Sequence, residues 1–206
     1  MDAIFLDIDG TLWDSTYPVA EAWNLVLEQK PEINLIITPE LLKTLFGKPL
    51  SEIAAIIFPE YDKNTQRKLI DECCEKEHKY LEDHPGIIFE GVVETIKELA
   101  KKHPVCIVSN CEAGYIELVM DKLGIKDCIT DFECPGYSGL GKGDNIKLVM
   151  ERNGYEDIIY VGDTQGDYEA ARKAGVPFVF CQYGFGKPEG YEYSVEKFSD
   201  LLTLLL

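Results

Sequence analysis

Positions 3–12 of the chain read AIFLDIDGTL, and this stretch decides the fold. Its first four residues are apolar and predict a short buried β-strand. Asp7 and Asp9 follow at once, and Gly10 then permits the backbone to turn. The carboxyl ends of parallel strands are where open α/β sheets bind their ligands. We therefore expect both carboxylates to converge on one site at the end of this strand.

Similar apolar runs recur later in the chain, and segments with helical periodicity separate them. Buried strands that alternate with amphipathic helices indicate a doubly wound parallel sheet with helices on both faces. We therefore predict an α/β fold of the Rossmann-like type. The expected strands lie at Ala3 to Leu6, Val105 to Val108, Asp157 to Val161 and Val176 to Cys181, with a shorter one at Cys128 to Phe132.

Residues 14–84 break this alternation, because they contain helix patterns but no convincing buried strand. We interpret them as a helical cap inserted into a core domain made of residues 1–13 and 85–206. A helical subdomain that only packs against the core is the alternative. The expected helix starts are Thr38-Pro39-Glu40 and Ser51, and a long helix is expected from Thr65 to His84.

Composition limits the classes of function. The 37 acidic and 20 basic residues give a net charge of −17, which disfavours nucleic acid as a partner. No apolar run approaches the roughly 20 residues that span a bilayer, and the N-terminus lacks the basic region of a signal peptide. We therefore expect a cytoplasmic protein without membrane contact. The seven cysteines lack disulfide or zinc spacing and are expected to be reduced and mostly buried.

A second pair of acids follows another predicted strand. Asp163 comes directly after the apolar run that ends in Gly162, and Asp167 lies four residues further on. Two acidic strand ends in one sheet make a site of hard oxygen ligands. Mg²⁺ favours such sites, in which one or two carboxylates are joined by water and substrate phosphate.

Two further segments offer groups that bind phosphate. Ser109 and Asn110 follow the strand at Val105 to Val108, where a hydroxyl and backbone N–H groups can donate to phosphate oxygens. Lys142 lies between two glycines at the start of a predicted helix. A cation is needed there because an aspartate nucleophile and an incoming phosphate repel each other.

In their order along the chain, the four motifs resemble those of the haloacid dehalogenase superfamily, in the branch with a helical cap after the first motif. Phosphoglycolate-phosphatase-type and β-phosphoglucomutase-type proteins are the nearest in pattern. The resemblance covers essentially the whole chain. It departs from the family at one point, where the usual Lys-Pro of the third motif is Lys142-Gly143. The matching segments are residues 5–12, 108–110, 142 and 162–167.

The resemblance implies a Mg²⁺-dependent phosphatase that hydrolyses a small phosphorylated metabolite through an aspartyl-phosphate. Asp7 would be the nucleophile and Asp9 the general acid and base. Asp7, the backbone carbonyl of Asp9 and Asp163 would hold Mg²⁺. The other implied roles are phosphate binding by Ser109, Asn110 and Lys142, support of the site by Thr11 and Asp167, and contact of Lys48 in the cap with an anionic group of the substrate.

Two other functions stay open at this point. A phosphomutase would use the same core but would retain the phosphoenzyme until its intermediate reorients. A non-catalytic interaction protein with this fold would have little reason to keep both Asp7 and Asp9. The second aspartate also favours phosphate substrates, because the dehalogenases of the superfamily resemble Asp-x-Tyr at this position. Neither the substrate nor the oligomeric state is indicated by the sequence.

Overall fold

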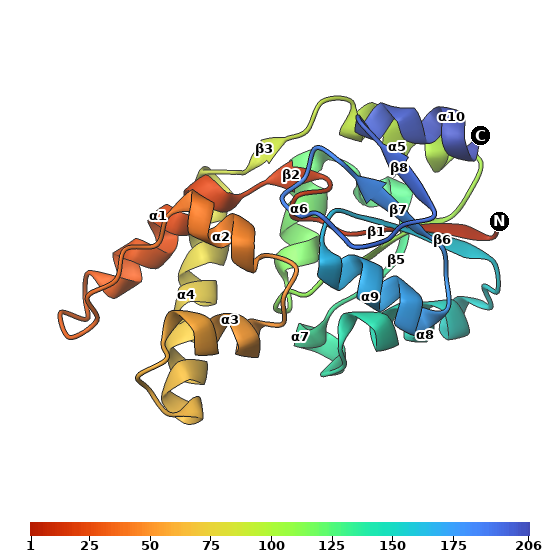
Figure 1. The fold of residues 1–206 in the computed structure, drawn as a ribbon. Helices are drawn as coiled ribbons and strands as arrows, with labels where there is room; N and C mark the ends of the chain where they lie inside the picture. Colours follow the sequence, from red (N-terminus) through yellow and green to blue (C-terminus); the bar gives the residue numbers. More distant parts are fainter.

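The computed structural model describes all 206 residues. A six-stranded sheet lies between two layers of helices, and four further helices stand beside it (Figure 1). The strand order is β5-β4-β1-β6-β7-β8, and every neighbouring pair is parallel. The prediction of a doubly wound α/β fold is confirmed. The strands are β1 (Ala3–Leu6), β4 (Val105–Val108), β5 (Ile129–Glu133), β6 (Ile158–Gly162), β7 (Phe178–Cys181) and β8 (Tyr193–Val195).

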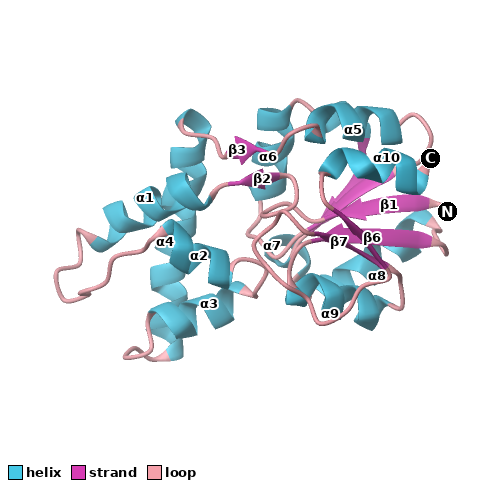
Figure 2. Cartoon of the chain, turned by 45° about the horizontal axis from the view of Figure 1, so that its top comes forward, coloured by secondary structure: helices cyan, strands magenta, loops and turns pink.

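The central strand β1 is buried on both faces, because its side chains alternate between two hydrophobic clusters. Ile4 and Leu6 belong to the larger cluster, together with residues of the helices above the sheet in Figure 2. Ala3 and Phe5 belong to the smaller one, with residues of the helices below it. The upper layer holds α5 (Val92–Leu99) and α10 (Leu201–Leu205), and the lower layer holds α8 (Lys142–Asn153) and α9 (Gln165–Ala174).

The strands that follow β1 in the chain lie on both sides of it in the sheet. β4 lies on one side of it and β6 on the other, so the topological switch point falls at the carboxyl end of β1. Loops that leave a switch point diverge and leave room for a ligand between them. Asp7 follows β1 directly and therefore lies where the loops after β1, β4 and β6 meet.

Four helices lie between two short strands that pair with each other. β2 (Trp13–Asp14) and β3 (Ile87–Ile88) form an antiparallel ribbon, and this ribbon carries both connections between the four helices and the sheet (Figure 1). No helix of the structure combines the length and the apolar character that crossing a membrane requires. The four helices are α1 (Thr16–Leu27), α2 (Pro39–Leu45), α3 (Leu50–Ile57) and α4 (Lys63–Asp83).

Of the three helix starts predicted in this segment, the structure confirms one and differs from two. Thr38 caps α2 as expected and accepts a hydrogen bond from the N–H of Leu41. The predicted start at Ser51 is wrong by one residue. Pro49 is the N-cap of α3, and its fixed φ places the start there without a side-chain cap. α4 begins before Thr65, because the carboxylate of Asp62 accepts from its first free N–H groups.

The remaining elements complete the core. Six of the seven cysteines are buried and the seventh is half-buried, and all have free thiols. The strand β8 was not predicted, because its short, partly exposed segment carries no apolar run. The elements not yet given are α6 (Tyr115–Leu123), α7 (Pro135–Ser138) and two short 3₁₀ helices, η1 (Lys126–Cys128) and η2 (Phe198–Asp200).

Candidate active site

A buried lysine joins two aspartates at the centre of the site. Nζ of Lys142 donates to Oδ1 of Asp7 over 2.8 Å and to Oδ1 of Asp167 over 2.6 Å. All three residues are almost fully buried. Burial alone would lower the pKa of Lys142, but the charges of Asp167 and Asp7 raise it above its ordinary value. Lys142 therefore stays charged. It donates to Oδ1 of Asp7, and no group of the protein donates to Oδ2.

Asp163 approaches the same point from the end of β6. Its Oδ1 accepts from the hydroxyl of Thr11 over 3.2 Å, and its Oδ2 accepts from the N–H of Phe185 over 2.6 Å. Gly10 is required for this approach, because its φ is +85° and an added Cβ would lie 2.2 Å from Oδ2 of Asp163. The turn after the first motif thus packs directly on the fourth.

Asp167 is held by the start of the helix that follows. Its Oδ2 accepts from the N–H and hydroxyl of Thr164, at 2.9 and 2.7 Å, and from the N–H of Asp163 at 3.2 Å. Thr164 in turn caps α9 in a reciprocal capping box. Since Lys142 occupies its other oxygen, Asp167 has both oxygens engaged. Its geometry is that of a residue that holds Lys142 and the loop in place.

The charge at this point fits a divalent cation. Carboxylate oxygens of Asp7, Asp163 and Asp167 lie within 4.8 Å of one another, and all three residues are buried. Lys142 is the one cation in contact with them, so two negative charges are left without a partner. Burial, with Asp167 adding to it, raises the pKa of Asp7 to about 7 and that of Asp163 well above its ordinary value. Three clustered carboxylates are the oxygen donors that Mg²⁺ prefers.

Asp9 is fixed by three donors on one of its two oxygens. Oδ1 accepts from Nε1 of Trp13 at 3.1 Å, from the hydroxyl of Ser15 at 2.6 Å and from that of Tyr115 at 2.8 Å. Burial raises the pKa of Asp9, although these hydrogen bonds oppose the rise. Because Oδ1 accepts three hydrogen bonds, a proton on this carboxyl belongs on Oδ2. Asp9 therefore has the arrangement of an oriented acid.

The segment after β4 contacts both the site and the helical segment. The hydroxyl of Ser109 has no partner in the protein and lines the cavity described below. Nδ2 of Asn110 donates instead to the backbone carbonyl of Gly47, between α2 and α3, over 2.8 Å. Gly47 itself packs on the site, since its φ is +87° and an added Cβ would lie 2.6 Å from Oγ1 of Thr164. Asn110 is thus a link between the core and the helices.

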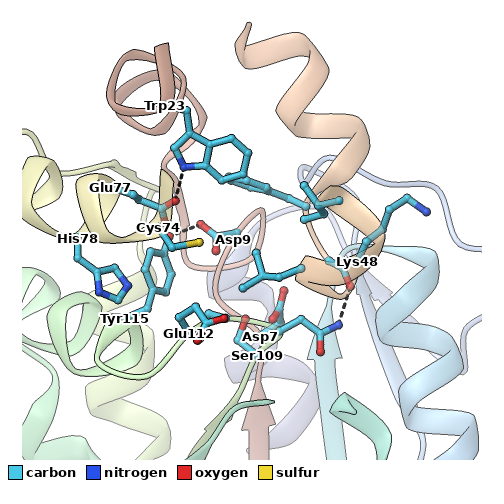
Figure 3. A pocket seen from close by; sticks show the side chains of 16 residues that line it. Asp7, Asp9, Trp23, Lys48, Cys74, Glu77, His78, Ser109, Glu112 and Tyr115 are labelled. Carbon is cyan, nitrogen blue, oxygen red and sulfur yellow. Dashed lines mark hydrogen bonds between the residues drawn. The ribbon is translucent and has the colours of Figure 1, made fainter. Parts of the chain in front are cut away.

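A cavity of about 40 Å³ lies between the aspartates and the helical segment. Asp7, Asp9 and Ser109 line one side, and Figure 3 shows Trp23 and Glu77 on the other. Nε1 of Trp23 donates to Oε2 of Glu77 over 2.8 Å.

Lys48 borders this cavity but does not extend its ammonium into it. Nζ of Lys48, in the loop before α3, pairs with Glu52 of α3 over 2.7 Å, and Figure 3 shows its side chain pointing away from the aspartates. The structure therefore brings together Asp7, Asp9, Ser109, Lys142, Asp163 and Asp167, with Thr11 and Asn110 at the edge, and leaves the charge of Lys48 outside.

Comparison with known proteins identifies the family of the chain. The sequence profile described as haloacid dehalogenase-like hydrolase matches residues 4–181. The chain belongs to this family.

Relatives in the family carry phosphatase names. A phosphoglycolate phosphatase of Photorhabdus laumondii is 27% identical, with 98% of this chain and 92% of the relative covered. An N-acetylmuramic acid 6-phosphate phosphatase of Pseudomonas putida is 24% identical, with 91% of this chain and 85% of the relative covered. A solved haloacid dehalogenase-like hydrolase of Streptococcus pneumoniae has a TM-score of 0.86 at 20% identity, with 100% of this chain and 99% of that one covered. It has the same fold as this chain.

Sequence reasoning missed the residues that surround Asp9 and the far wall of the cavity. Trp13 begins β2 and Ser15 precedes α1, four and six positions after Asp9, so both were within reach by spacing alone. Tyr115 is 106 positions from Asp9, so no local pattern links the two. Glu77 lies on a helix rich in acids, and only its burial distinguishes it from the others.

Proposed function

We propose that this member of the family is a Mg²⁺-dependent phosphatase that hydrolyses a small-molecule phosphate ester through an aspartyl-phosphate on Asp7. The observation that carries the proposal is the buried pair of Asp7 and Lys142, 2.8 Å apart, beside Asp163 and next to the oriented carboxyl of Asp9. The phosphatase names of the relatives support it.

The residues that would hold Mg²⁺ are Asp7, Asp163 and the backbone carbonyl of Asp9. When bound, the ion would neutralise charge on the phosphoryl oxygens and on the carboxylates that face them. Asp167 is assigned to support, because both of its oxygens are already engaged. The excess of negative charge around Lys142 is the feature that favours a cation here.

The first displacement uses Asp7 and Asp9. A carboxylate oxygen of Asp7 attacks phosphorus, and the bond between phosphorus and the leaving oxygen breaks while Asp9 gives that oxygen its proton. Lys142 and the hydroxyl of Ser109 donate hydrogen bonds to the phosphoryl oxygens. These donors stabilise the charge that moves onto the phosphoryl group.

The second displacement releases phosphate. A water molecule attacks phosphorus, Asp9 takes the proton of that water, and the bond between phosphorus and Asp7 breaks. Asp9 thus returns to the protonated state that its burial favours, and the free carboxylate of Asp7 is restored.

We also propose that residues 14–84 are a cap that opens to admit the substrate. The cavity lies between the aspartates and the helical segment, so a substrate bound at Asp7 would contact both parts. The contact of Asn110 with Gly47 and the ribbon of β2 and β3 are the places where such a movement would act.

The proposal predicts that hydrolysis requires Mg²⁺. Turnover of p-nitrophenyl phosphate should disappear after exhaustive chelation and return on addition of Mg²⁺. Ca²⁺ should inhibit, because it takes more ligands in a looser geometry. The measurement is the initial rate as a function of each metal. Full activity in the chelated protein, with metal content checked by elemental analysis, would contradict the proposed role of Mg²⁺.

A further inference from the structure

Glu77 is a buried acid that the proposed chemistry does not use. It lies on α4 and is 8% exposed. Its Oε2 accepts from Trp23, and its Oε1 has no partner in the protein. The residue lines the same cavity as Asp7 and Asp9. A polar atom in such a position, facing a cavity and without a partner, is the common mark of a ligand contact.

The position of Glu77 relative to Asp9 decides which part of a substrate it meets. In Figure 3, Asp7, Asp9 and Glu77 follow one another from the floor of the cavity to the wall formed by the helical segment. Phosphorus bonds to Asp7, and the leaving oxygen takes its proton from Asp9. The rest of the leaving group therefore extends past Asp9 toward Glu77.

No positive charge balances this end of the cavity. Lys48 pairs with Glu52 and points away. Arg67 pairs with Asp71 and Glu112, at 2.7 and 3.1 Å. Burial lowers the pKa of His78, which favours its neutral form. An anionic leaving group would therefore lose its hydration at this end of the cavity and find no free cation there, and burial of an unpaired charge disfavours binding.

We propose that Glu77, oriented by Trp23, binds a neutral hydroxyl that the leaving group carries near the phosphate, and that leaving groups with a carboxylate are rejected because no cation faces this end of the cavity. This inference rests on the proposed phosphatase function and narrows its substrate class. Phosphoglycolate, which appears in the names of several relatives, falls in the rejected class.

The protonation state of Glu77 favours a hydroxyl over an amine on the leaving group. Burial raises the pKa of Glu77 to about 8, although the hydrogen bond from Trp23 opposes the rise. A carboxyl that holds its proton near neutral pH can both donate to and accept from a hydroxyl. An ammonium group would instead require the ionised form. The apolar neighbours in the wall, such as Ile53 and Leu50, also suit a neutral group.

The test compares three esters of equal length: hydroxyethyl phosphate, phosphoglycolate and aminoethyl phosphate, with p-nitrophenyl phosphate as the generic substrate. The wild-type protein should show a kcat/KM for hydroxyethyl phosphate at least about 100-fold above that for phosphoglycolate. Glu77→Leu should reduce this ratio at least about tenfold, because leucine can neither donate to nor accept from the hydroxyl of hydroxyethyl phosphate. Hydrolysis of p-nitrophenyl phosphate shows whether the variant is still an active phosphatase.

Glu75→Leu is the matched control, because Glu75 lies on the same helix, is exposed and pairs with Lys79. It should leave the ratio unchanged. Equal or better use of phosphoglycolate by the wild type, or an unchanged ratio in Glu77→Leu, would overturn the inference while leaving the phosphatase function intact. The wild-type ratio decides this even if the variant does not fold.

Two other outcomes are distinct. A preference for aminoethyl over hydroxyethyl phosphate would overturn the assignment of a neutral hydroxyl and point to an ammonium group instead. Failure of the folded, Mg²⁺-loaded protein to hydrolyse any of the four esters would overturn the proposed function, and the inference with it.

Discussion

Asp7→Asn is expected to lower kcat by at least about 1,000-fold, because a neutral amide is a poor nucleophile. The fold should survive, since Lys142 keeps its 2.6 Å contact with Asp167. The measurement is the rate of hydrolysis of p-nitrophenyl phosphate at saturating Mg²⁺, together with the thermal midpoint of the variant.

Asp157→Asn is the control for this variant. Asp157 lies just before β6, at the opposite end of the sheet, and its exposed carboxylate pairs with the N-terminus over 3.0 Å. Its replacement should leave the rate within about twofold, since exposed pairs contribute little. Retention of more than a small fraction of activity by a well-folded Asp7→Asn protein would rule out Asp7 as the nucleophile.

Lys142→Ala has the second largest expected effect. Removal of a charged donor to the transition state costs on the order of 2–4 kcal/mol, or roughly a 30- to 900-fold loss of kcat/KM. The loss should be similar for every ester, because the phosphoryl group is common to all of them. The variant should also unfold more easily by about 3–5 kcal/mol, since Asp7 and Asp167 lose their buried counterion.

Lys48→Ala is the matched lysine control. The ammonium of Lys48 is 2.7 Å from Glu52 in a pair that is 40% and 49% exposed, so its loss should change kcat/KM little for any ester. The comparison is made with two esters for both variants. A loss confined to one ester in Lys142→Ala would contradict its proposed contact with the phosphoryl group. A large loss in Lys48→Ala would show that the ammonium turns into the cavity.

The positions of Asp7, Asp9 and Asp163 were predictable because each depends on local sequence and one rule of topology. An apolar run gives a buried strand, and parallel strands bring their carboxyl ends to one edge. Lys142 was predictable for a different reason. A site with clustered acids and an anionic substrate requires a cation, and the glycines around Lys142 leave it free to approach.

The contacts made by the inserted helices could not be predicted in the same way. Glu77 is one of many acids on α4, and its burial against Trp23 depends on how α1 packs on α4. Asn110 follows a strand, as a phosphate ligand should, yet one N–H of its amide donates to the backbone carbonyl of Gly47. Lys48 lies in a loop of the expected kind but pairs with Glu52 of α3. Such outcomes depend on tertiary packing, which short-range patterns do not encode.

The most direct test of the proposed mechanism is to locate the phosphoryl group during turnover. The protein is mixed with a phosphate ester and Mg²⁺, quenched in acid within a single turnover, digested and analysed by mass spectrometry. We predict that the peptide containing Asp7 carries one phosphoryl group, which is lost on treatment with hydroxylamine. The label should be absent without Mg²⁺ and absent in Asp7→Asn. Release of product with no phosphoryl group on Asp7 at any time in the turnover would contradict the account.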